Sequence, residues 1–195
     1  MQLLTNPTAY HALQVELDAF YSSFPSGSDT SSKNIISDAQ ARTLPYLQAA
    51  VCEGLRLFPS ATSRSFPKII PYSTSSATSL LSSPSITKQG DVILRVYLPP
   101  GTEIDTALGV YGICRDKQFR GADADCFRQE RWLQAEKEVE VAEGDATEDT
   151  RFAQMLRRVE LVFGSGQYVC AGRALAYMEM GKVVVTEVSL FYCSP

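Results

Sequence analysis

One cysteine lies in a setting that favours metal binding. Residues 163–174 read Phe-Gly-Ser-Gly-Gln-Tyr-Val-Cys-Ala-Gly-Arg-Ala, which places Cys170 in a glycine-rich turn directly before a predicted helix. The free amides and the positive dipole end of a helix start favour the thiolate, the form of cysteine that binds metals. Gly164, Gly166 and Gly172 let the backbone come close to a flat cofactor. Taken alone, a cysteine before a helix is more often a small core residue.

A second candidate set consists of opposite charges at helical spacing. Glu53 and Arg56 are three residues apart in Glu-Gly-Leu-Arg, so their side chains project from the same face of a helix. Such a pair is usually a solvated surface ion pair. Leu55 beside it indicates a partly buried setting.

The elements that must position these residues are predicted to be mostly helical. Asn6-Pro7 is a typical helix start, because asparagine caps free amides and proline suits the first turn. Residues 24–34, rich in serine and glycine, are predicted to be a loop, and residues 171–187 a helix. The acidic stretch 134–150 is predicted to be a solvated loop, and residues 159–163 a short strand.

The segment that carries Glu53 has both a start signal and a stop signal. Ser37 and Gln40 resemble a capping box, and apolar residues recur at helical spacing over 44–58 until Pro59 ends the pattern. Pro45 marks a break or a second helix start.

The middle of the chain is predicted to contain strands. Residues 92–98 and 102–111 are rich in β-branched and aliphatic residues and flank the turn sequence Pro-Pro-Gly at 99–101, which predicts a strand pair. Residues 72–84, mostly serine and threonine, are predicted to be a flexible insertion.

Composition excludes several classes of protein. The 195 residues are 45% hydrophobic and carry a net charge of -4, which lacks the basic excess that nucleic-acid binding needs. The five cysteines show no paired zinc-type spacing, and a disulfide framework is not expected. The one histidine, His11, is expected on the surface. No signal peptide or span of roughly 20 apolar residues is found, and no oligomer is implied.

The cysteine loop resembles the haem-ligand loop of the cytochrome P-450 family. The family pattern is Phe-x-x-Gly-x-x-x-Cys-x-Gly, and Phe163, Gly166, Cys170 and Gly172 stand in register with it. Ala174 continues the usual pattern.

Two upstream motifs resemble the same family in the same order. Glu53 and Arg56 match its Glu-x-x-Arg motif. Residues 127–132 resemble its Phe-x-Pro-Glu-Arg-Phe segment, with Gln129 in place of proline and Trp132 as the aromatic residue. By this resemblance Arg131 completes a structural triad in which Glu53 lies between two arginines.

The resemblance implies a mainly α-helical cytochrome P-450 fold with small β-sheets, of which residues 1–195 form the partial, proximal haem-binding half. It implies a monooxygenase that binds haem b through Cys170, receives electrons from a reductase and inserts one atom of O2 into a small organic substrate. The cofactor-binding residues implied are Phe163, Gly164, Gly166, Cys170 and Gly172, together with Lys68 toward a haem propionate.

Departures from the family lead to a further expectation. Tyr168 stands where the family often has a basic residue for a propionate. The region that supplies the family's distal helix has no counterpart before Asn6, and further strands normally follow Pro195. We therefore expect a truncated gene product, and a non-catalytic haem-binding remnant is the alternative function. The cellular location stays open, although full-length family members are often membrane-anchored.

A dinucleotide-binding protein is the remote alternative. A strand over 159–163, then Gly164-x-Gly166, a helix and Glu187 would imitate a βαβ unit. Val169 occupies the position of the third glycine.

Overall fold

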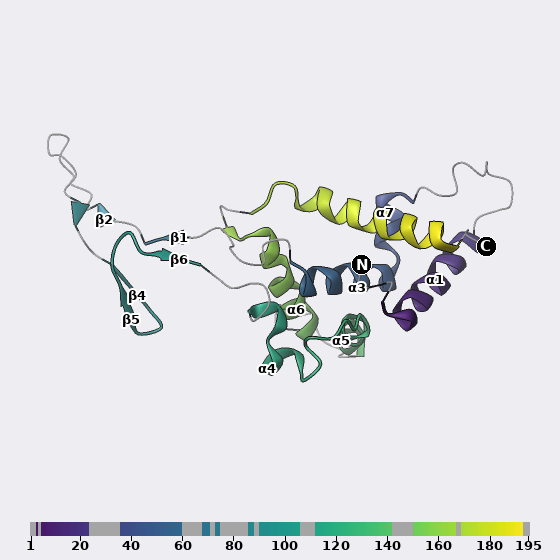
Figure 1. The fold of residues 1–195 in the computed structure, drawn as a ribbon, viewed down its shortest axis with the longest axis horizontal. Helices are drawn as coiled ribbons and strands as arrows, with labels where there is room; N and C mark the ends of the chain where they lie inside the picture. The colour runs from purple at the N-terminus through teal and green to yellow at the C-terminus, as the bar shows by residue number, and fades with distance from the viewer. Residues whose placement is uncertain are drawn as a thin grey trace.

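A computed structural model describes residues 3, 5–23, 36–59, 68–70, 73–74, 86–87, 90–105, 112–141, 150–166 and 169–192. This part of the chain contains seven α-helices, two short 3-10 helices and six short strands. The helices form one body, and the strands lie to one side of it (Figure 1). The prediction of a mainly helical fold with small sheets is confirmed. Among the described residues, no helix is long and apolar enough to cross a membrane.

The first helix begins where the sequence predicts. Helix α1 spans Pro7–Ser22, and the side chain of Asn6 accepts the backbone N–H of Ala9. Leu13 and Leu17 point into the core from this helix. Residues 24–34, predicted to be a loop, lie outside the described residues.

Two helices follow. The second begins at Pro45, which confirms one of the two predicted alternatives, a second helix start. Helix α2 spans Asp38–Arg42 and begins with the predicted capping box of Ser37 and Gln40. Helix α3 spans Pro45–Leu57 and ends two residues before Pro59.

Helix α3 is the central element, in contact with α1, α2, α5, α6 and α7. Its N-cap residue, Leu44, has no side-chain acceptor for the free amides of the first turn. Glu16 of α1 supplies one instead, because its two carboxylate oxygens accept the N–H groups of Tyr46 at 2.8 Å and Leu47 at 2.9 Å. This contact fixes the start of α3 against α1.

The remaining helices surround α3. The 3-10 helix η1 spans Ile113–Arg115, α4 spans Lys117–Arg120 and α5 spans Glu130–Val141. Helix α6 spans Arg151–Glu160 and continues into the 3-10 helix η2 at Leu161–Phe163, and α7 spans Arg173–Tyr192.

Two predictions for this region are wrong. Residues 134–141 belong to helix α5 rather than a loop, because the buried Trp132 and Ala135 anchor an otherwise polar helix to the core. Residues 159–163 are helical rather than a strand, because Met155 and Val159 are four residues apart and bury one face of α6.

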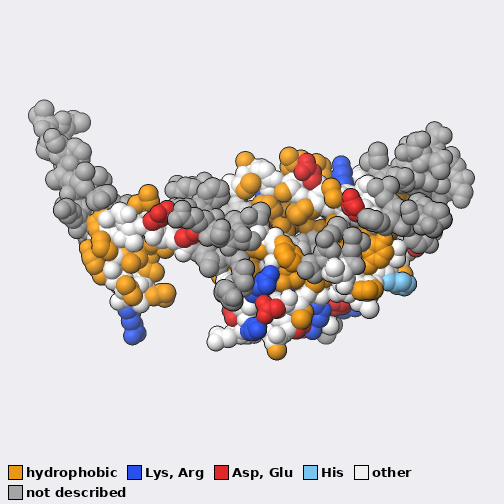
Figure 2. Space-filling model, viewed as in Figure 1, with side chains coloured by type: hydrophobic (Ala, Val, Ile, Leu, Met, Phe, Trp, Pro, Cys, Tyr) orange, Lys and Arg blue, Asp and Glu red, His pale blue; other side chains and the backbone are white. Residues whose placement is uncertain are grey.

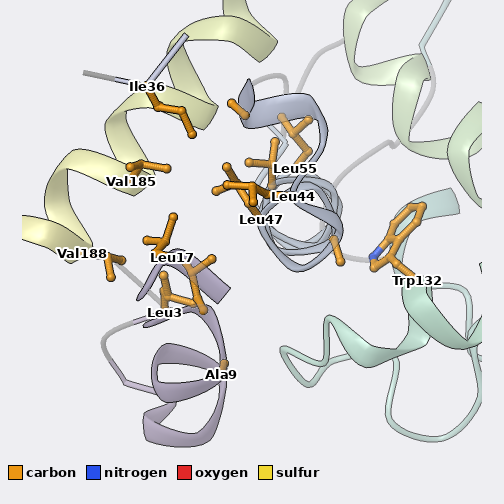
Figure 3. Close-up of a cluster of buried hydrophobic side chains, with 14 of the residues drawn as sticks. Leu3, Ala9, Leu17, Ile36, Leu44, Leu47, Leu55, Trp132, Val185 and Val188 are labelled. Atoms are coloured by element: carbon orange, nitrogen blue, oxygen red, sulfur yellow. The ribbon is translucent and has the colours of Figure 1, made fainter. Parts of the chain in front are cut away.

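The hydrophobic core lies between α1, α3 and α7, with Trp132 at its edge (Figure 3). Leu17 of α1 and Val185 of α7 are both buried, and in this view they lie on the same side of Leu47 of α3 (Figure 3). The core therefore ties the last helix of the chain to the first.

The strands pair in three antiparallel couples: β1 (Lys68–Ile69) with β6 (Glu103–Ile104), β2 (Ser73–Thr74) with β3 (Ile86–Thr87), and β4 (Asp91–Ile93) with β5 (Val96–Leu98). The predicted pairing of 92–98 with 102–111 is therefore wrong. Leu94 and Arg95 both have positive φ, at 52° and 68°, and close a two-residue hairpin within that first segment. Of the predicted insertion at 72–84, only β2 is described.

The β4–β5 hairpin exposes apolar side chains. Val92, Leu94, Val96 and Tyr97 are each more than half exposed, and hydrophobic side chains gather on this end of the molecule (Figure 2).

Replacement of Glu16 by alanine tests the contact that starts α3. We expect Glu16→Ala to lower the free energy of unfolding by about 1–2 kcal/mol, because the amides of Tyr46 and Leu47 lose their acceptors. Chemical denaturation followed by circular dichroism measures the change. Asp18→Ala, an exposed position on the same helix, is the control, and equal losses in the two variants would contradict the capping role.

Candidate functional site

A fully buried carboxylate organises the first part of the site. Glu53 of α3 is 0% exposed. Among the described residues, five N–H groups donate to its two oxygens, at 2.8–3.1 Å. They are Nε and Nη2 of Arg56, Nε of Arg131, the backbone N–H of Arg128 and the indole Nε1 of Trp132. The structure thus brings the candidate residues Glu53, Arg56 and Arg131 together.

The two arginines extend this network to η1, to the end of α4 and to the loop between α4 and α5. Nη1 of Arg56 donates to the carbonyls of Cys114 at 3.0 Å and Ala124 at 2.6 Å. Nη1 of Arg131 donates to the carbonyl of Arg120, and its Nη2 to that of Asp123. Each guanidinium therefore holds a carboxylate with one edge and backbone carbonyls with another, which a lysine could not do.

Two of the five donors were not found by sequence reasoning. Trp132 was noted as the aromatic residue of its motif, but its indole N–H was not assigned to Glu53. The signal was present, because a buried tryptophan usually finds an acceptor for that N–H. The N–H of Arg128 carries no side-chain signal and depends on the path of the loop.

The network also sets the charge of Glu53. Burial raises the pKa of this carboxyl, but hydrogen bonds and charges from Arg56, with contributions from the Arg128 amide and Arg131, outweigh burial and lower the pKa below its usual 4.5. Glu53 is therefore ionised at neutral pH.

The cysteine loop lies at the start of α7. Gly164 and Gly166 turn the chain at positive φ, 79° and 57°, which a residue with a side chain adopts less readily. The N–H of Cys170 then donates to the carbonyl of Phe163 at 2.7 Å, which closes the loop on η2. A Cβ added to Gly172 would lie 3.7 Å from the sulfur of Cys170, so this glycine leaves the approach to the sulfur open.

The surface around the sulfur is exposed and mainly apolar. Cys170 is a free, exposed thiol, and Ala171, Gly172 and Ala174 are exposed beside it. Val169 is 47% exposed and Leu175 is 53% exposed. We call residues 169–172, 174 and 175 the ligand-loop face.

The other described cysteines differ from Cys170. Cys52 is mostly buried, and burial raises the pKa of its thiol to about 12. Cys114 is fully buried, and burial likewise raises the pKa of its thiol. Cys126 is exposed and lies four residues before the start of α5. Among the described cysteines, Cys170 alone is exposed and lies in a glycine-rich turn that leads into a long helix.

The remaining candidates are placed as follows. Lys68 is the first residue of β1 and lies opposite Ile104. Tyr168 lies outside the described residues. Phe163 packs its ring against Tyr177 of α7, with ring centroids 5.3 Å apart. His11 is exposed on α1, and the described residues contain no cluster of three or more histidine, cysteine and acidic residues that could hold a metal.

The structure contradicts the dinucleotide-binding alternative at its first strand. It requires a strand before Gly164, but the chain there is helix α6 followed by η2. A βαβ unit therefore does not form at this position.

Comparisons with known proteins agree with the motifs. The model of the cytochrome P-450 family matches residues 78–195. The chain is 33% identical over 183 residues to cytochrome P-450 monooxygenase ABA1 of Pyricularia oryzae, which covers 94% of this chain and 29% of that protein. It is 33% identical over 196 residues to cytochrome P-450 monooxygenase abl1 of Leptosphaeria maculans, which covers 98% of this chain and 27% of that protein.

A relative with a more specific name is also similar. Pisatin demethylase of Fusarium vanettenii is 28% identical over 182 residues, which cover 93% of this chain and 27% of that protein. The chain thus spans 27–29% of the length of these three relatives.

Neutralising Glu53 is predicted to be strongly destabilising. Glu53→Gln leaves two buried guanidinium groups without their carboxylate, and we expect the free energy of unfolding to fall by about 3–5 kcal/mol. Urea denaturation measures the loss. The control is Glu138→Gln, which removes an exposed carboxylate 3.5 Å from Arg151 and should cost no more than about 1 kcal/mol. A loss for Glu53→Gln as small as that of the control would show that the network does not stabilise the fold.

The lowered pKa of Glu53 predicts how its contribution to the free energy of unfolding changes with pH. Because the folded-state pKa of Glu53 is lowered, its contribution to stability is present above pH 4.5 and is lost as the pH falls through the folded pKa. The difference in unfolding free energy between the wild type and Glu53→Gln should therefore shrink below pH 4.5. A difference that stays constant or grows as the pH falls would contradict the direction of the shift.

Proposed function

The chain belongs to the cytochrome P-450 family, and we propose that it forms the haem-binding part of a monooxygenase, with Cys170 as the thiolate ligand of the haem iron. The relatives named cytochrome P-450 monooxygenase support the reaction class. Because the chain spans only 27–29% of their length, the activity of the whole protein is part of this proposal.

The observation that carries the proposal is the ligand-loop face. It combines one exposed thiol with exposed apolar neighbours at the start of a long helix. A flat, mainly apolar macrocycle laid on this face would cover Val169 and Leu175 and bring a metal to the sulfur. Apolar burial of this kind contributes roughly 25 cal/mol per Å² of surface removed from water.

The residues present fit such a group. Gly172 places no side chain over the sulfur, and the positive φ of Gly164 and Gly166 keeps the loop tight. The hydrogen bond from the N–H of Cys170 to the carbonyl of Phe163 fixes the backbone at the proposed ligand. Phe163 is held in turn by Tyr177, whose ring packs against it.

When bound, a cysteine-ligated haem supplies O2 activation, and the thiolate pushes electron density toward the iron. The chain's own residues perform a different task. They fix the backbone of Cys170, leave no side chain at position 172 over the sulfur and place the cysteine three residues before α7.

The proposal also covers the cofactor, the partners and the role of the buried network. We assign haem b as the cofactor from the family, with Lys68 of β1 as a point charge for a propionate. We also assign a reductase as electron donor and a small organic molecule as substrate. Glu53, Arg56 and Arg131 are assigned a structural role, because the Glu53 carboxylate is fully buried and faces the arginines rather than the ligand-loop face.

The spectrum of the carbon-monoxide complex tests the proposed ligand. After reconstitution with haem and reduction, the protein should show a strongly red-shifted Soret band that Cys170→Ala abolishes. The matched control is Cys126→Ala, which removes another exposed thiol and should keep the band. A band that survives in Cys170→Ala, or that is lost equally in both variants, would overturn the assignment of Cys170.

A further inference from the structure

One buried arginine is not explained by the network around Glu53. Arg120, the last residue of α4, is 3% exposed. Its Nε, Nη1 and Nη2 atoms are buried and have no hydrogen-bond partner among the described residues. This contrasts with Arg56 and Arg131, whose guanidinium groups donate to carboxylates and carbonyls.

Two aromatic rings pack near the Arg120 guanidinium. Its Cζ lies 5.4 Å from the ring centroid of Phe119 and 5.5 Å from that of Trp132. Cation–π contacts of this kind contribute about 0.5–2 kcal/mol. The desolvation of a buried ion costs several kcal/mol, so the rings do not offset it. A carbonyl oxygen would accept a hydrogen bond from an in-plane N–H group of the guanidinium, and neither ring does so.

The buried charges around Arg120 are also more positive than negative. Among the described residues that are almost fully buried, three arginines, Arg56, Arg120 and Arg131, accompany a single carboxylate, Glu53. Asp123 is 34% exposed at its side chain and pairs with Arg131 and Arg128. Even with Asp123 included, the interior holds more positive than negative charge.

A second arginine with a buried N–H that has no partner among the described residues lies in the same region. The Nε atom of Arg115 is buried without a partner among the described residues. Arg115 follows the fully buried Cys114 in η1, and Nη1 of Arg56 donates to the carbonyl of Cys114 at 3.0 Å. The region around Cys114 therefore offers several N–H donors and an excess of positive charge.

We propose that Arg120 anchors a binding site for a small monovalent anion, chloride, between α4 and the indole of Trp132. The unpaired groups are all donors, which selects an anion over a cation. The guanidinium is almost fully buried, which selects a small ion over sulfate or an organic carboxylate. Because Arg120 stays protonated at neutral pH, the anion would neutralise a buried charge that has no hydrogen-bonded counter-ion among the described residues.

Anion-dependent stability tests this site on the full chain without haem. Sodium chloride should raise the unfolding midpoint in a saturable manner, compared with sodium gluconate at equal ionic strength. In Arg120→Met, which keeps the length of the side chain without its charge, the chloride affinity should fall at least about tenfold. The control Arg42→Met removes an exposed arginine and should keep the chloride effect.

A second readout uses Trp132, the only tryptophan of the chain. Its side chain is 2% exposed, so collisional quenching by ions in solution should be weak. Bromide bound beside Arg120 should instead quench the fluorescence in a saturable manner, and Arg120→Met should remove this quenching. The proposal is overturned if chloride and gluconate stabilise the wild type equally, or if Arg120→Met retains both the chloride effect and the saturable quenching.

Discussion

The buried carboxylate of Glu53 is the interaction on which the rest of the structure depends. A carboxylate removed from water costs several kcal/mol unless hydrogen bonds and opposite charges replace the solvent. Here five N–H groups from α3, α5 and the loop before α5 do so. The most distant donor, Trp132, lies 79 residues from Glu53 in the sequence. The carboxylate therefore has all its hydrogen bonds only when these segments have assembled. The network therefore links the stability of one helix to the position of another.

This network is connected to the cysteine loop through α3. Helix α3 packs on α6 and α7, and α6 continues directly into η2. The carbonyl of Phe163 at the end of η2 accepts the N–H of Cys170, while α7 begins three residues later. The sulfur is thus held between two elements that both pack on the helix carrying Glu53. A buried network elsewhere in the fold can in this way define where the proposed ligand, Cys170, lies.

Local signals in the sequence predicted some parts of this fold and could not predict others. The helix start at Asn6-Pro7 and the capping box at Ser37 depend on neighbouring residues, and both are observed. Helix α5 was missed because its few apolar residues act through distant packing of Trp132. The hairpin at Leu94–Arg95 was missed because neither residue usually adopts positive φ. Arg120 was not singled out, because its burial arises from segments that meet only in the folded chain.

Hydrogen exchange of the Trp132 indole N–H tests the central role of Glu53 most directly. This is the only indole of the chain, so its proton gives a single resonance, and it donates to the fully buried carboxylate at 3.0 Å. If the network holds the helices together, this proton should exchange only through opening that also exposes the core, as slowly as the most protected amides of α3. Exchange at the rate of a solvent-exposed indole, in a chain that remains helical, would show that the fold does not depend on this carboxylate.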